Sequence, residues 1–337
     1  MINTVYINGV GAVSAQGIWR ADIFDTATSL SAAISPAIQP NYKALIAPAM
    51  IRRMSKGIKM SIFAAQQALD EASMAVPDAI ITGTGLGCSE DSEKFLRNIL
   101  DDNEQYLTPT AFIQSTHNTV AAQIARRLGC KGYNFTYVNG SSSFESALLD
   151  ALLQLQTGES AQVLVGGMDE IAAYTYYLLQ LVGYIHSNDT QLSLRENNSA
   201  AVNYSEGATF FALSTEKTSS SYAQLLDVTQ VNKQTKDELP PFVHDFLGQH
   251  KLSVADIDAL VLGINGDNEG DSYYKHLAAL IPDADAVYYK HLSGQYDTAS
   301  TFGLAVGARL LQQQAIPTDL QWGGAKKKAY KKVLLYN

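Results

Sequence analysis

The segment best placed to carry chemistry is 139–146, Asn-Gly-Ser-Ser-Ser-Phe-Glu-Ser, which joins a β-type run to an Ala- and Leu-rich helical pattern. At such a turn, the free N–H groups and the positive dipole end of the helix stabilise a thiolate or an oxyanion. Enzymes therefore hold nucleophiles there. Gly140 occupies this position and has no side chain, so it offers no nucleophile.

The serines after Gly140 offer a hydroxyl in its place, with Ser141 as the candidate nucleophile. A nucleophile elbow requires the pattern Gly-x-Ser-x-Gly, and Phe144 stands where the second glycine belongs. Serines are also good helix caps, and Glu145 places a favourable charge in the first helical turn. We therefore favour a capping role for the serines and keep Ser141 as a nucleophile in an alternative hypothesis.

Histidines are the next candidates, because imidazole exchanges protons near neutral pH. His117 precedes a helical pattern that starts at Thr119, and it is suited either to act as a base or to sit at a helix cap and subunit interface; we favour the second role. His291 follows Lys290 and is expected in the core. The other histidines show no metal-ligand spacing, so no metal is expected: His186, His244, His250 and His276. Segment 83–88 departs from the dinucleotide fingerprint because its last glycine falls too early, so no cofactor is expected.

Short β-type runs alternate with longer helical patterns, which is typical of a layered α/β fold. The first series predicts strands at 5–7, 79–82, 135–138 and 162–165, helices at 55–72, 119–128 and 144–156, and neighbouring strands at 208–213 and 223–228. The second predicts a helix start at 253, strands at 259–262, 286–289 and 332–336, and helices at 272–280 and 298–313. The repeated order predicts a duplicated core with a shorter second copy.

We place the boundary between the two copies after residue 215. Residues 1–215 form an N-terminal half and residues 216–337 a shortened C-terminal half of one compact body. The polar stretch 214–239 contains further strand signals, so it is expected to run along the surface rather than act as a flexible linker.

Composition restricts the classes of function. A chain of 337 residues with 46% hydrophobic content can bury a large core, and its net charge of −9 disfavours nucleic acid as a partner. Cys88 and Cys130 are too few for a disulfide framework, which favours a reducing compartment. Neither a secretion signal nor a membrane-spanning run is evident, so we expect a cytoplasmic protein.

Five junctions occur in an order that resembles the β-ketoacyl-acyl-carrier-protein synthase family of the thiolase superfamily. They are segments 9–14, 52–56, 165–169, 205–208 and 322–324, the last standing where the family's final glycine-rich loop would be. The resemblance implies the five-layered αβαβα thiolase-like fold. Segments 112–119 and 290–296 resemble more closely the synthase-like and chain-length-factor-like proteins of aryl polyene and flexirubin pigment clusters.

The resemblance also implies a degenerate catalytic site. The family condenses acyl chains with a cysteine, two histidines and a supporting lysine, and these four positions fall on Gly140, Asn265, Gln295 and Lys290 of this chain. Only the lysine is kept, so no condensation by this chain alone is expected. Asn118 matches an asparagine of the family and is expected to be structural, while Phe112 and His117 are candidates for the acyl pocket or the subunit interface.

These observations favour a catalytically silent homologue that pairs with an active ketosynthase, reaches acyl carrier protein through that complex, and helps set chain length. The resemblance places the subunit interface at the strand around 135–138 and the helix from Thr119. Tyr174, Tyr177 and Tyr184 are suited either to an aryl-acyl tunnel or to this interface. Two alternatives stay open: an acyltransferase that uses Ser141 or His117, and a non-enzymatic acyl-binding homodimer.

Overall fold

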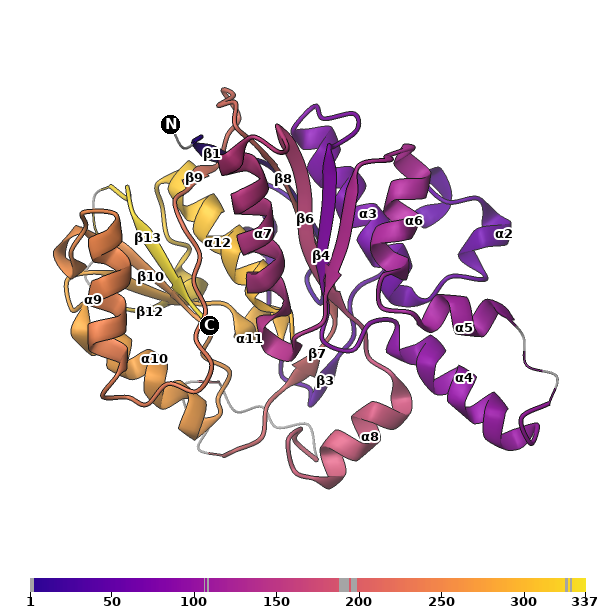
Figure 1. The fold of residues 1–337 in the computed structure, drawn as a ribbon. Helices are drawn as coiled ribbons and strands as arrows, with labels where there is room; N and C mark the ends of the chain where they lie inside the picture. The colour runs from indigo at the N-terminus through magenta and orange to yellow at the C-terminus, as the bar shows by residue number, and fades with distance from the viewer. Residues whose placement is uncertain are drawn as a thin grey trace.

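The computed structural model describes residues 3–105, 107, 109–187, 194, 199–324, 327 and 329–337. Its elements form five layers, helix–sheet–helix–sheet–helix (Figure 1). This is the predicted thiolase-like α/β fold. The layers follow from the alternation of buried strands with amphipathic helices, because each sheet has two apolar faces that helices must cover.

The larger sheet has seven strands. They are β1 (Val5–Ser14), β2 (Gly17–Ile18), β4 (Ala79–Gly83), β5 (Tyr133–Tyr137), β6 (Gln162–Asp169), β8 (Gly207–Ser214) and β9 (Ala223–Leu225). Its order is β2-β1-β8-β6-β4-β5, with β9 paired to β1. Strands β4, β5 and β6 are parallel, whereas β8 runs antiparallel to both β6 and β1. β5 is therefore one edge of this sheet.

Helices cover both faces of the larger sheet. The outer face carries α3 (Lys56–Glu71) and α6 (Thr119–Leu128), and the inner face carries α7 (Ser143–Thr157) and α12 (Ser300–Gln313) (Figure 1). The glycines in the middle of β1 let α3 approach closely. A Cβ at Gly9 would lie 2.0 Å from the carbonyl oxygen of Ala68, so a larger residue there would push the helix away.

The smaller sheet has the order β12-β11-β10-β13, with β10 (Ala259–Leu262), β11 (Asp285–Tyr288), β12 (Gln321–Gly323) and β13 (Val333–Tyr336). β11 and β13 both run parallel to β10. One face packs on α12, and the other packs on α9 (Leu239–Gln249) and α10 (Asn268–Leu280). The inner layer of α7 and α12 therefore lies between the two sheets, and its buried residues form one apolar cluster with residues of both sheets.

Several elements differ from the sequence-based predictions. β9 pairs with β1, so β1 separates it from β8, its predicted neighbour. The predicted helix start at 253 is only a short 3₁₀ turn, Val254–Asp256. Segment 322–324 contributes to β12, an edge strand that precedes the last strand of the smaller sheet. Four longer helices were not predicted: α4 (Ser89–Asp101), α5 (Pro109–Ser115), α8 (Ala173–Leu181) and α9. The short helices α1 (Ile23–Thr26), α2 (Pro48–Ile51) and α11 (Lys290–Ser293) were not predicted either. Among the described helices, none combines the length and apolar character needed to cross a bilayer.

Candidate functional site

Gly140 lies at the turn between β5 and α7. It begins the 3₁₀ turn Gly140–Ser142 and has a φ of 54°, in the left-handed region that favours glycine. A Cβ built on it would meet no atom within 4 Å. The position therefore has space for a side chain, but its backbone conformation disfavours one.

The hydroxyl of Ser143 holds this turn in place. Its Oγ accepts a hydrogen bond from the Asn139 N–H at 2.7 Å and lies 2.9 Å from the carbonyl oxygen of Thr84, to which it donates. Ser142 occupies the N-cap of α7 but makes no side-chain capping bond, so the predicted capping by the serines is wrong in this respect. The turn is instead tied to the loop that follows β4.

Asn265 and Gln295 are hydrogen-bonded to each other. Asn265 follows β10, Gln295 follows the short helix α11 (Lys290–Ser293), and the Asn265 Nδ2 donates to the Gln295 Oε1 at 3.2 Å. The Asn265 Oδ1 in turn accepts the N–H of Asp267 at 3.0 Å. Neither amide takes up a proton near neutral pH, so this pair can bind polar groups but cannot act as an acid or a base.

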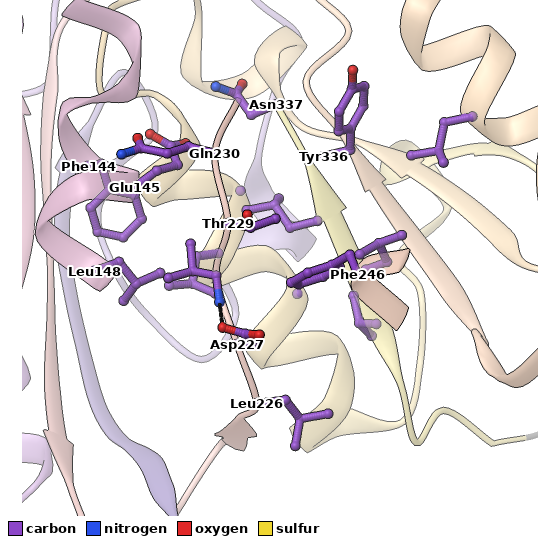
Figure 2. A pocket seen from close by; sticks show the side chains of 18 of the residues that line it. Phe144, Glu145, Leu148, Leu226, Asp227, Thr229, Gln230, Phe246, Tyr336 and Asn337 are labelled. Atoms are coloured by element: carbon purple, nitrogen blue, oxygen red, sulfur yellow. Dashed lines mark hydrogen bonds between the residues drawn. The ribbon is translucent and has the colours of Figure 1, made fainter. Parts of the chain in front are cut away.

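Lys290 is the titrating group of the site. Its side chain is 5% exposed, and burial lowers its pKa to about 8, while the charges of Asp271 and Glu145 favour its protonated form. Lys290, Ser141, Asn265 and Gln295 line one cavity of about 690 Å³, part of which is drawn in Figure 2. The structure thus brings together three of the four positions that the resemblance singled out, beside the helix tip that carries Gly140.

Titration of Lys290 tests this environment. We expect its ammonium group to lose its proton near pH 8, well below the ordinary value of 10.5. The unfolded chain holds that proton more tightly than the folded chain does. Below pH 8 the charged Lys290 therefore lowers the free energy of unfolding by its full amount. This destabilisation disappears as the pH rises from 8 towards 10.5. NMR of ¹³C-labelled lysine side chains gives the midpoint, with Lys290→Arg to assign the resonance. A Lys290 resonance that titrates with the surface lysines would contradict the buried placement.

Two acidic residues of the site were missed by sequence analysis. Asp271, near the start of α10, accepts the N–H groups of Asn265 and Gly266 at 3.0 and 3.1 Å and fixes the loop that presents Asn265. Glu145 lies on the first turn of α7 and lines the cavity. Burial raises the pKa of Glu145, while Ser300 and Lys290 oppose this shift. The only signal in the sequence was an acidic residue at the start of each helix, a pattern that is common at helix N-termini.

Phe112, His117 and Asn118 lie outside this cavity. Phe112 is 55% exposed on α5 and packs against Phe95 of α4, with ring centroids 5.5 Å apart. His117 is exposed, and its ring borders Gly87. Asn118 is the N-cap residue of α6 but makes no side-chain capping bond. These three residues therefore lie away from the cavity that Lys290 lines.

A broad apolar surface surrounds them, and we call it the apolar face. It consists of exposed residues of α4, α5 and α8: Leu96, Leu100, Phe112, Ile113, Tyr174, Tyr177, Leu178 and Leu181. The exposed β5 residues Tyr133 and Phe135 lie on the α7 side of the larger sheet, where the Tyr133 hydroxyl donates to Asp150 Oδ2 at 3.1 Å. α4 contacts both α5 and α8, and α6 links α5 to β5. Groups of exposed apolar side chains on neighbouring elements are typical of interaction sites. In the described part of the chain, no group of acidic, histidine or cysteine side chains is arranged to hold a metal ion.

Known proteins share sequence features and the fold with this chain. The sequence model of the family "Beta-ketoacyl synthase, N-terminal domain" matches residues 36–219. No curated protein matches the chain by sequence.

Solved structures share the fold at low identity. The ishigamide ketosynthase/chain length factor has a TM-score of 0.77 at 17% identity, over 99% of this chain and 92% of that chain. A β-ketoacyl synthase from Burkholderia phymatum STM815 has a TM-score of 0.79 at 15% identity, over 98% and 91%. The ketosynthase ApeO in complex with its chain length factor ApeC, from Xenorhabdus doucetiae, has a TM-score of 0.73 at 16% identity, over 99% and 91%.

Proposed function

Because this chain belongs to the β-ketoacyl synthase family, we propose that it is a catalytically silent, chain-length-factor-like subunit that pairs with an active ketosynthase. The observation that carries the proposal is the site itself. Gly140 supplies no thiol, and an amide pair, Asn265 and Gln295, stands where the resemblance places two histidines. Such a site can bind an acyl thioester through hydrogen bonds, but it lacks the thiol and the imidazoles with which the family condenses acyl chains.

The apolar face supplies the second part of the proposal. A silent subunit acts through shape, because an apolar wall placed across a partner's tunnel limits how far an acyl chain extends without any titrating group. Phe112 and Ile113 are 55% and 56% exposed on α5, so they are available to a partner bound over this face. Acyl carrier protein would then meet the assembled pair rather than this chain alone.

The substrate class is the finer part of the proposal. The segments that contain Phe112 and Lys290 resemble the synthase-like proteins of aryl polyene and flexirubin clusters. One structural neighbour is described as a ketosynthase bound to its chain length factor. We therefore assign the subunit to elongation of aryl polyene or related polyketide-type acyl chains.

Restoring the cysteine tests the silent site. We expect Gly140→Cys alone to yield no condensation of malonyl and acyl units above background, because the imidazoles are still missing and the left-handed backbone holds the thiol in a strained position. Intact-protein and product mass spectrometry after incubation with acyl carrier substrates gives the readout. Elongation by this single variant without a partner would overturn the proposal.

Ser141 supports the alternative of an acyltransferase, because it is exposed and lines the cavity. His117 lies outside that cavity, so the two candidates cannot form a nucleophile–base pair there. An acyl adduct on the native chain that disappears in Ser141→Ala would favour this activity over the silent subunit. Co-expression with candidate ketosynthases then separates a heterodimer from a homodimer by mass.

A further inference from the structure

The helices that carry the apolar face bury little of their own surface. Figure 1 shows α4 and α8 projecting from one edge of the molecule. The structure describes both helices in full: Ser89 is the one buried residue of α4, and α8 buries none. By contrast, α3 buries many side chains, among them Ile58, Met60 and Leu69. Apolar packing therefore contributes little to holding α4 and α8 in place, and elements of this kind open at a lower free energy than the core does.

The start of α8 is held by a side chain of α4. The Oε2 of Glu93 accepts the N–H of Tyr174 at 3.0 Å, and its Oε1 accepts the N–H of Thr175 at 2.6 Å. The N-cap residue of α8 is Ala172, whose methyl group cannot accept a hydrogen bond. Glu93 thus supplies, from a neighbouring helix, the cap that α8 lacks, and it satisfies two of the free N–H groups at the start of α8.

The start of α4 is held in turn by the segment before α8. The Oε1 of Glu170 accepts the N–H of Glu90 at 3.0 Å, and the hydroxyl of Ser89 donates to the Glu170 carbonyl oxygen at 3.1 Å. Cys88, the N-cap residue of α4, makes no side-chain capping bond. The Oε2 of Glu170, which is buried, accepts the N–H of Gly57 in α3 at 2.6 Å. Two carboxylates therefore connect three helices in series, with Glu170 between α3 and α4 and Glu93 between α4 and α8.

The chain is anchored on both sides of α8. Before the helix, the N–H of Ile171 donates to the Oε2 of Glu206, a fully buried residue, at 2.8 Å. After the helix, the carbonyl oxygen of Tyr184 accepts the N–H of Val202 at 2.9 Å, and Ile185 is 1% exposed. Opening of α8 can therefore stay confined to residues 173–183, between two segments that remain in place.

The apolar contacts of α8 form a small cluster of their own. Tyr176 and Leu179 are partly buried, and they pack against Ala33, Ile185 and Tyr204. Because a cluster of this size excludes little water, the two hydrogen bonds from the Glu93 carboxylate are a large part of what holds α8 closed.

We propose that the apolar face is a conformational device in which α4 and α8 open and close as a coupled unit, with Glu93 transmitting the order of one helix to the other. Coupling of this kind is reciprocal, so whatever orders α8 also orders α4, and by the same factor. A partner bound to Tyr174 and Tyr177 of α8 would thereby organise the α4 side of the apolar face as well. For partner binding this rests on the silent-subunit proposal, whereas the coupling itself is a property of the free chain.

Hydrogen exchange of the full chain, measured by mass spectrometry without any partner, tests the coupling. Peptides covering residues 89–101 and 173–181 report on α4 and α8, and a peptide covering 56–71 reports on α3. We expect Glu93→Gln to speed exchange of 173–181 by about tenfold or more, because its amide nitrogen meets an N–H donor, and to speed exchange of 89–101 by a smaller factor. Glu90→Gln is the matched control: Glu90 is exposed and contributes its N–H rather than its carboxylate, so exchange should change by less than about threefold.

A second variant tests the path through Glu93. Ser89→Ala removes the hydroxyl that ties α4 to Glu170 and leaves the hydrogen bonds of α8 intact. We expect it to speed exchange of both 89–101 and 173–181 by about fivefold in the native chain. In the Glu93→Gln background, Ser89→Ala should no longer affect 173–181, because the connection between the helices is already broken.

The coupling is wrong if Glu93→Gln speeds exchange of 173–181 and leaves 89–101 as in the native chain. An effect of Ser89→Ala on 173–181 that is equally large with and without Glu93 would also contradict it, because the path would then bypass this carboxylate. Faster exchange of 56–71 by the same factor as 173–181 would show that α4 and α8 open only with the core, and the separate unit would not exist. Each of these outcomes concerns the free chain, so none of them decides whether a ketosynthase binds it.

Discussion

Asp169→Asn is expected to lower the free energy of unfolding by about 2–4 kcal/mol, more than any surface substitution. Asp169 is 4% exposed, and its Oδ1 accepts from the Thr84 hydroxyl at 3.0 Å and the Gly85 N–H at 2.8 Å. Its Oδ2 accepts both the N–H and the hydroxyl of Thr298 at 2.8 Å. An amide nitrogen in place of either oxygen faces donors that it cannot satisfy. Equilibrium urea unfolding measures the loss.

Asp78→Asn is the matched control. Asp78 also accepts two backbone N–H groups, those of Ala161 and Gln162 at 2.9 and 3.0 Å, but it is exposed, so water can replace the lost bonds. We expect this variant to lose less than about 1 kcal/mol. Equal losses in the two variants would show that burial of Asp169 does not set the cost.

The position of Asp169 explains why its replacement should destabilise both the larger sheet and the segment before α12. β6 and the loop after β4 belong to the larger sheet, whereas Thr298 precedes α12 in the second half. One carboxylate thus fixes the loop beneath Gly140's turn to the segment that follows Gln295. Burial and the neighbouring Asp297 charge raise its pKa to about 6, while the hydrogen bonds from Thr298 and Gly85 oppose this shift and favour the ionised form.

The spacing of apolar residues in the sequence located the helices and strands that bury their side chains in a regular pattern. The helix at 119–128 and the strand at 259–262 were predicted at their observed bounds, because both have a clear apolar pattern between polar ends. α9 was missed because Pro240 and Pro241 interrupt the pattern, although proline fits the first turn of a helix. α8 was missed for a different reason: it buries none of its residues, so it lacks an amphipathic period.

The site was predictable in part. The resemblance identified four positions, Gly140, Asn265, Gln295 and Lys290. That the chain cannot condense acyl units with these residues stays a prediction. The hydrogen bond between Asn265 and Gln295 joins residues 30 positions apart at the ends of different elements, and only the packing of β10 against β11 brings them together. Asp271 and Glu145 looked like ordinary first-turn acids, because their burial depends on the opposite wall of the cavity.

The edge strand β5 provides the second large expected effect. Tyr133, Phe135 and Val138 are 41%, 45% and 48% exposed, and the rings of Tyr133 and Phe135 stack with centroids 6.1 Å apart. An exposed aromatic edge strand is prone to pair with another chain, and a monomer would protect it with charge or proline. We expect Phe135→Arg to weaken subunit association about 100-fold or more, because the interface would have to bury a desolvated cation in place of an aromatic ring. Sedimentation velocity of the purified protein, alone and co-expressed with a ketosynthase, measures the shift.

Ile38→Arg separates this effect from a general loss of apolar surface. Ile38 is 61% exposed, but its N–H bonds to Ser14 at the end of β1, and β8, β6 and β4 separate β1 from β5 in the sheet order. The substitution adds the same charge and should leave association within about twofold of the native value. If Phe135→Arg also leaves the assembly intact, β5 is not the interface, and a subunit that works by closing a partner's tunnel would need another contact surface.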